Sequence, residues 1–135
     1  MSHISYLAIL SDDPFPLADF YRGNFGMVEL GRSVDGDVTL SDGGFNVTIF
    51  RQRPALKELR MENGLHHIGV AVDDVEETVA RYRAKYPRGT VIAEADDLQH
   101  GEVRIHDPEC NPVTLSRRNF GLPAAEARIP RIAHL

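Results

Sequence analysis

The chain lacks what several protein classes require. Its 135 residues include one cysteine, Cys110, and no tryptophan, and a lone cysteine excludes both a disulfide framework and a thiolate zinc cage. No apolar run approaches the ~20 residues that span a bilayer, so we expect no membrane partner. The net charge of -5 provides no basic excess, and we therefore expect no nucleic-acid partner.

The beginning of the chain has no export signal. Residues 1–10 contain neither the basic start nor the cleavage site of a signal peptide, so we expect a cytoplasmic protein. The composition is that of a globular chain, with 42% hydrophobic and 26% charged residues. This length favours a single domain over residues 1–135.

The sequence contains an internal repeat. The string YLAILSDD, which ends at Asp13, and the string HIGVAVDD, which ends at Asp74, lie 61 residues apart. A later pair, NVTI from Asn46 and PVTL from Pro112, is offset by 66 residues, so the second copy has extra loop residues. Two copies favour a duplicated module over a solenoid, which needs at least about three repeats.

The secondary-structure signals agree between the two copies. Residues 4–10 and 68–72 are short β-rich runs, each followed by Asp-Asp. Asp74 is a capping residue that opens a helix, which Pro87 ends. Asp13 opens a poorer helix, which we expect to run through Tyr21 and to end at the following glycines. Further strand-like runs follow at 27–30, 37–41 and 46–51, and again at 90–93, 102–106 and 113–117.

These patterns predict an α+β fold of two tandem βαβββ modules. Module one covers residues 1–51, and module two covers residues 65–117. A charged linker with room for one helical turn occupies residues 52–64. The tail, residues 118–135, has no strong pattern, and we expect it on the surface or across a partner subunit.

This layout resembles the vicinal oxygen chelate superfamily, which includes glyoxalase I, bleomycin-resistance proteins and extradiol dioxygenases. The strongest match is the segment from His67 to Val75, and the next is the segment from Asp107 to Leu115, which is similar to the family's Asp-Pro-x-Gly-Asn turn. The resemblance implies that the modules form a cupped mixed sheet around a small-molecule site. It also implies a homodimer, because paired modules in this family often build their cups at subunit interfaces.

The metal positions of the family are degenerate here. In metal-dependent members four strand positions supply the ligands, and the resemblance places them at Tyr6, Thr48, His67 and Thr114. Only His67 is a usual ligand, and a threonine hydroxyl cannot offset an ion's charge as a carboxylate does. We therefore expect no cofactor. The alternative is a divalent metal held by His67 together with His3 or a residue of a partner chain.

Strand alternation predicts which side chains line the cup. If His67 faces inward, Gly69 and Ala71 do so too, while the residues between them meet the helix. The matching set in module one is Tyr6, Ala8 and Leu10.

The last hairpin is expected to bring a cation into the cup. A turn centred on Glu109 places Arg104 opposite Thr114 and His106 opposite Pro112. Arg104 would then share the cup with His67 and is a good bidentate partner for a carboxylate or phosphate. In the plainer interpretation, Arg104 is a solvated strand residue paired with a nearby glutamate, and His67 only caps a strand end.

The sequence thus favours a small-molecule binding protein of this superfamily. We expect it to bind an acidic or partly aromatic ligand through Tyr6, Thr48, His67, Arg104 and Thr114. One alternative is a metal-dependent lyase, isomerase or dioxygenase of the glyoxalase type. Another is a metal-free enzyme in which His67 is the general base and Tyr6 or Arg104 stabilises negative charge. A third is a subunit with a closed cup that serves assembly only.

Overall fold

The order β-α-β-β-β occurs twice in residues 2–93 and 103–117, which the computed structural model describes. The first half comprises β1 (His3–Ser11), α1 (Pro14–Phe25), β2 (Val28–Arg32), β3 (Val38–Ser41) and β4 (Asn46–Arg51). A short helix, α2 (Pro54–Glu58), occupies the predicted linker. The second half comprises β5 (Gly64–Ala71), α3 (Val75–Lys85), β6 (Val91–Ile92), β7 (Val103–His106) and β8 (Pro112–Ser116).

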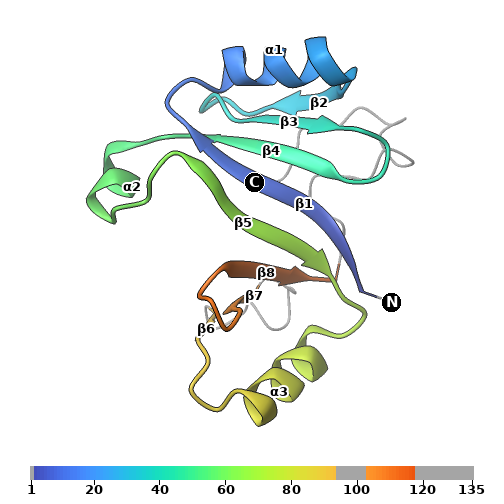
Figure 1. Cartoon of the computed structure of the whole chain (residues 1–135), viewed down its shortest axis with the longest axis vertical. Coiled ribbons are helices and arrows are strands. Elements are labelled where there is room, and N and C mark those ends of the chain that lie inside the picture. The colour runs from blue at the N-terminus through green and yellow to red at the C-terminus, as the bar shows by residue number, and fades with distance from the viewer. Residues whose placement is uncertain (1, 94–102, 118–135) are drawn as a thin grey trace.

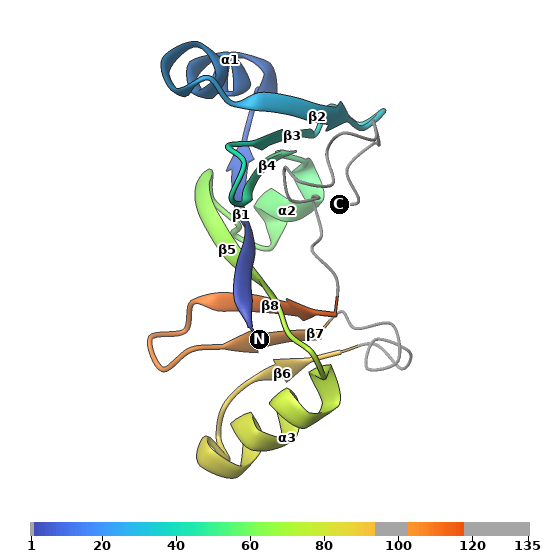
Figure 2. The ribbon, with the colours of Figure 1, turned by 90° about the vertical axis from the view of Figure 1, so that its right-hand side faces the viewer.

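The strands form one mixed sheet in the order β2-β3-β4-β1-β5-β8-β7-β6. The two halves meet where β1 pairs antiparallel with β5, and each of these strands pairs in parallel with the last strand of its own half. Helix α1 lies against the first half, and α3 lies beside the second (Figure 1). Figure 2 shows the bent sheet from the side, with α1 and α3 at opposite ends.

The α+β class and the mixed sheet are confirmed. The module boundaries at 1–51 and 65–117 remain predictions, and the tail lies outside the described residues. No helix of the described chain is long and apolar enough to cross a membrane.

Helices α1 and α3 begin directly after Asp13 and Asp74, as the sequence predicts. The Asp74 carboxylate accepts a hydrogen bond from the Glu77 backbone N–H at 3.0 Å, which satisfies a donor in the first turn of α3. Asp13 caps α1 in the same way, through the N–H of Phe15. The helix runs through Tyr21 to Phe25, so of the two glycines expected to end it, Gly23 lies inside the helix and Gly26 follows its last residue. Gly26 ends it in a left-handed conformation, with φ at 68°, that favours glycine.

Each helix covers its own hydrophobic cluster on the outer face of the sheet. The clusters take Ile9 from β1 and Val72 from directly after β5, with Val70 packed alongside, and these residues alternate with the predicted cup-facing positions, as expected. The first cluster contains Ile9, Ala18, Val38, Leu40, Val47 and Ile49. The second contains Val72, Val75, Val79, Val103 and Leu115, with Val70 packed against it.

The predicted register of the last hairpin is also confirmed. Arg104 lies opposite Thr114, and His106 lies opposite Pro112. The Asp107 carboxylate fixes the turn by accepting hydrogen bonds from the backbone N–H groups of Glu109, at 2.9 Å, and Asn111, at 2.8 Å. Because the register is correct, Arg104 projects from the same face as Thr114.

The packing analysis predicts a clear contrast between two leucines. Leu40 is fully buried under α1, so Leu40→Ala should lower the free energy of unfolding by about 2–5 kcal/mol. Leu65 is 76% exposed, and the matched change Leu65→Ala should stay within about 0.5 kcal/mol of the parent. Urea unfolding followed by circular dichroism measures both. Equal losses would contradict the assignment of the core to the helix-covered face.

Candidate functional site

A pocket of about 300 Å³ lies against the inner face of the sheet. This volume suits a small organic molecule. One part of its wall is apolar, comprising Leu10, Phe50, Leu56 and Met61. The other part is polar, comprising Tyr6, Arg53, His66, His67, Arg104 and Thr114. The central strands β1 and β5 supply the middle of the site, with α2 and the last hairpin on either side.

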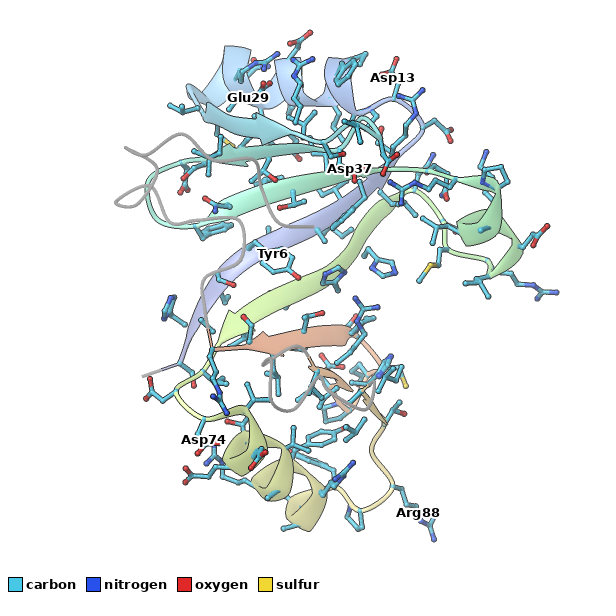
Figure 3. All side chains as sticks on the ribbon, turned by 180° about the vertical axis from the view of Figure 1, so that it is seen from behind. Tyr6, Asp13, Glu29, Asp37, Asp74 and Arg88 are labelled. Atoms are coloured by element: carbon cyan, nitrogen blue, oxygen red, sulfur yellow. The ribbon has the colours of Figure 1, made fainter. Side chains whose placement is uncertain are left out.

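A glycine on β5 makes room for Tyr6. Figure 3 shows Tyr6 projecting from β1 across the neighbouring strand. A Cβ atom at Gly69, its partner in the register, would overlap the tyrosine ring. The ring therefore packs directly on the backbone of β5. Its hydroxyl lies 3.0 Å from Nε2 of His67, and the two rings meet edge to face at 5.5 Å.

A β-bulge brings a second histidine into the pocket. Ala8 pairs with His67, but the next residue of β1, Ile9, pairs with Leu65, so His66 is an extra residue in β5. In a regular strand, consecutive side chains lie on opposite faces, and a bulge re-aims one of them. His66 and His67 consequently both line the pocket, and their Nδ1 atoms are 2.7 Å apart.

The electrostatics of the pocket keep both imidazoles neutral. Burial, the positive charge of Arg104 and the neighbouring His66 lower the pKa of His67 to about 3. Burial and Arg104 also lower the pKa of His66. At neutral pH both rings therefore exchange hydrogen bonds as neutral groups.

Arg104 is the cation that this pocket offers to a ligand. No aspartate or glutamate is among the described residues that line the site. Arg53 is already engaged, since its Nη2 lies 3.4 Å from Asp37 and 3.6 Å from Asp35. The Nε of Arg104 donates to the Thr114 hydroxyl at 3.3 Å, and within residues 2–93 and 103–117 Arg104 forms no ion pair.

The structure brings four of the five predicted ligand-binding residues together. Tyr6, His67, Arg104 and Thr114 line this pocket. Thr48 does not line it, because its side chain is buried against Thr39, with the two hydroxyl oxygens 3.4 Å apart. The part these residues play in binding stays a prediction.

Much of the pocket wall was not predicted from the sequence. His66 was not predicted to line the pocket, because regular alternation places it on the opposite face from His67. The only signal in the sequence was that the two histidines are adjacent. Phe50, the next-to-last residue of β4, pairs with Leu10 and follows the same alternation as Thr48. The charged linker was interpreted as a connection, yet it contributes Arg53, Leu56 and Met61. The apolar side chains of Leu56 and Met61 within that charged linker were the available signal.

The side chains at the four positions that the resemblance assigns to metal ligands already have hydrogen-bond partners within the protein. His67 uses Nε2 towards Tyr6 and Nδ1 towards His66, and the Thr48 hydroxyl faces Thr39. His3 begins β1 opposite Ala71 and is not among the pocket-lining residues. In the described ranges no group of three or more His, Cys, Asp or Glu side chains is placed to hold a metal.

The comparison with protein families identifies the class. The model of the Glyoxalase/Bleomycin resistance protein/Dioxygenase superfamily matches residues 3–115. The chain belongs to this superfamily, which confirms the resemblance seen in its motifs. The comparison with curated proteins finds no match.

Solved structures share this fold at low sequence identity. A hypothetical protein from Bacillus halodurans C-125 aligns with a TM-score of 0.60 and 17% identity, over 84% of this chain and 93% of that one. The methylmalonyl-CoA epimerase of Mycobacterium tuberculosis aligns with a TM-score of 0.61 and 15% identity, over 84% and 85%. The 2,3-dioxygenase LapB from Pseudomonas sp. KL28 has a TM-score of 0.59 and 21% identity, over 84% of this chain and 40% of that one. These similarities establish the fold alone.

The lowered pKa of His67 predicts how stability depends on pH. In the unfolded chain its pKa returns to about 6.5, so below that pH the unfolded state binds a proton that the folded state does not. This contribution lowers the free energy of unfolding as the pH falls from 6.5 towards 3, by at most about 1.4 kcal/mol per pH unit. Above pH 6.5 it is constant.

Urea unfolding at pH 7.5 and pH 5 measures this effect. His67→Gln should lose less stability between the two pH values than the parent does. A parent and a His67→Gln variant with the same pH dependence would contradict the burial of a neutral imidazole.

The contact between Tyr6 and Gly69 predicts the effect of one methyl group. Gly69→Ala should displace the tyrosine ring and break its hydrogen bond to His67, because the new Cβ occupies the ring's position. We expect a loss of about 1–3 kcal/mol from overpacking. We also expect the NMR signals of the His67 ring to shift. Gly23→Ala is the control, since nothing lies within 4 Å of its added Cβ, and an unshifted His67 spectrum in Gly69→Ala would refute the contact.

Proposed function

We propose that the protein binds a small organic acid with an aromatic or branched apolar part, and that it does so without a metal. The observation that carries this proposal is the placement of Arg104 in a partly apolar pocket whose described lining has no carboxylate. An arginine without an acidic partner in such a site favours a ligand that brings the negative charge with it.

The two parts of the wall suit the two parts of such a ligand. A carboxylate beside Arg104 gains a charge-assisted hydrogen bond. The rest of the molecule can displace water from Leu10, Phe50, Leu56 and Met61, and burying apolar area contributes about 25 cal/mol per Å². The neutral histidines add hydrogen-bonding groups without a competing charge.

The donor set supports binding without a metal. A catalytic divalent ion needs about three protein ligands, at least some of them anionic or imidazole. At the corresponding positions this chain has one imidazole, one phenol and two threonine hydroxyls, and the imidazole already hydrogen-bonds through both nitrogens. These residues do not fit the family's metal. We also propose that the protein is a homodimer and that it is cytoplasmic.

A thermal-shift experiment with a matched pair of ligands tests the proposal. Phenylacetate should raise the Tm of the purified full chain, and uncharged phenylacetamide of nearly the same shape should not. Arg104→Gln should abolish the shift, because it removes the cation that meets the carboxylate. Arg88→Gln is the control, since Figure 3 shows Arg88 far from Tyr6, beyond α3.

Metal dependence is tested on the same samples. Chelation with EDTA should leave the phenylacetate shift unchanged. The metal content is then measured after incubation with iron(II), manganese, nickel or zinc and removal of the excess. Near-stoichiometric metal that is lost in His67→Ala would overturn metal-independent binding and favour a lyase, isomerase or dioxygenase of the glyoxalase type. Equal shifts with acid and amide would overturn the role of Arg104.

A further inference from the structure

Tyr6, His67 and His66 form one continuous hydrogen-bonded chain in the pocket. The Tyr6 hydroxyl meets Nε2 of His67 at 3.0 Å, and Nδ1 of His67 meets Nδ1 of His66 at 2.7 Å. Both end residues, Tyr6 and His66, line the pocket. Nε2 of His66 has no hydrogen-bond partner among residues 2–93 and 103–117, so it is the ring atom left for a ligand.

The hydrogen-bonded chain of Tyr6, His67 and His66 has two tautomeric states, which differ in the direction in which the hydrogen bonds are donated. The contact between the two Nδ1 atoms needs one hydrogen, because two would clash and none would leave two lone pairs facing each other. When Tyr6 donates to His67, His67 donates to His66, and Nε2 of His66 carries a hydrogen. When the order is reversed, Nε2 of His66 is a bare acceptor and the Tyr6 O–H is turned away from His67. Both states carry the same charge.

We propose that this chain is a bifunctional proton relay with which the protein catalyses the keto–enol interconversion of small 2-oxo acids. The proposal rests on the organic-acid binding proposed above. A relay whose two ends reach one ligand can remove a proton at one atom while delivering another proton nearby, and no net charge develops in the pocket.

The substrate class follows from what surrounds the relay. In the proposed pose Arg104 pairs with the carboxylate of a 2-oxo acid, and the adjacent carbonyl oxygen and C3–H face the two histidines and Tyr6, which line the same pocket. The side chain beyond C3 meets the apolar wall at Phe50 and Leu56. Held in this way, the two atoms that exchange protons lie next to groups that can accept and donate.

The reaction starts from the state in which Nε2 of His66 is a bare acceptor, and it balances without any further reactant. Nε2 of His66 takes the proton from C3, and the C3–H electron pair forms the C2=C3 double bond. The electrons of the carbonyl π bond move to its oxygen, which takes the Tyr6 proton. Tyr6 regains a proton from Nε2 of His67, whose Nδ1 takes the proton of His66 Nδ1. The chain ends in its other state, and the reverse transfer or exchange with solvent resets it.

The local backbone suits this task. The bulge at His66 and the absence of a side chain at Gly69 place the two ends of the relay.

Phenylpyruvate is the probe for this activity, because it combines a 2-oxo acid with an aromatic ring. Ultraviolet absorption follows the decay of its enol, and NMR in D2O follows the exchange of its C3 hydrogens. The full chain should accelerate both at neutral pH. His66→Gln and Tyr6→Phe should each lose about 10²–10⁴-fold of the acceleration. His3→Gln and Arg88→Gln should retain it, and circular dichroism verifies that every variant is folded.

A third variant separates a relay from a lone base. His67→Gln leaves His66 in the pocket but interrupts proton transfer to Tyr6, so the relay requires a loss as large as that of His66→Gln. Full activity in His67→Gln, His66→Gln or Tyr6→Phe would overturn the relay. Stabilisation by phenylacetate without acceleration of phenylpyruvate exchange would overturn the relay and leave the binding proposal standing. The absence of both effects would overturn the two proposals together.

Discussion

The packing of the Tyr6 ring on the bare backbone of Gly69 is the constraint on which the site depends. It occurs where β1 meets β5, the pairing that joins the two halves of the sheet. A side chain at position 69 would lift the ring away, and the tyrosine hydroxyl would leave His67. This contact between a large residue and a small one therefore couples the junction of the halves to the geometry of the pocket.

The second feature on which the site depends is a local imbalance of charge in the pocket. The chain as a whole is acidic, with a net charge of -5, yet the described lining of the pocket has two arginines and no carboxylate. Arg53 is neutralised by Asp35 and Asp37, whereas burial, reinforced by the positive charge of Arg104, holds the pKa values of both histidines down. A low-dielectric site strengthens this effect, because surrounding water does not screen it.

Regular periodicity was predictable from the sequence, and departures from it were not. The repeat, the aspartate caps and the register of the last hairpin depend on local rules, so Arg104 and Thr114 were placed correctly. Thr48 lies at the expected strand position but is held against Thr39, a contact between strands that alternation does not specify. His66 was missed because a bulge reverses its face, and Leu56 and Met61 because a linker seldom forms a wall.

The linker that contains α2 makes the two sides of the pocket unequal. Duplication alone would give two related half-sites, but Arg53, Leu56 and Met61 occur once and close the pocket from one side. The hydrophobic clusters that stabilise the sheet do not use these three residues. Changes at Leu56 or Met61 can therefore reshape the proposed binding pocket and leave both clusters intact. Under the proposed function, ligand preference can thus diverge through a segment outside the two hydrophobic clusters.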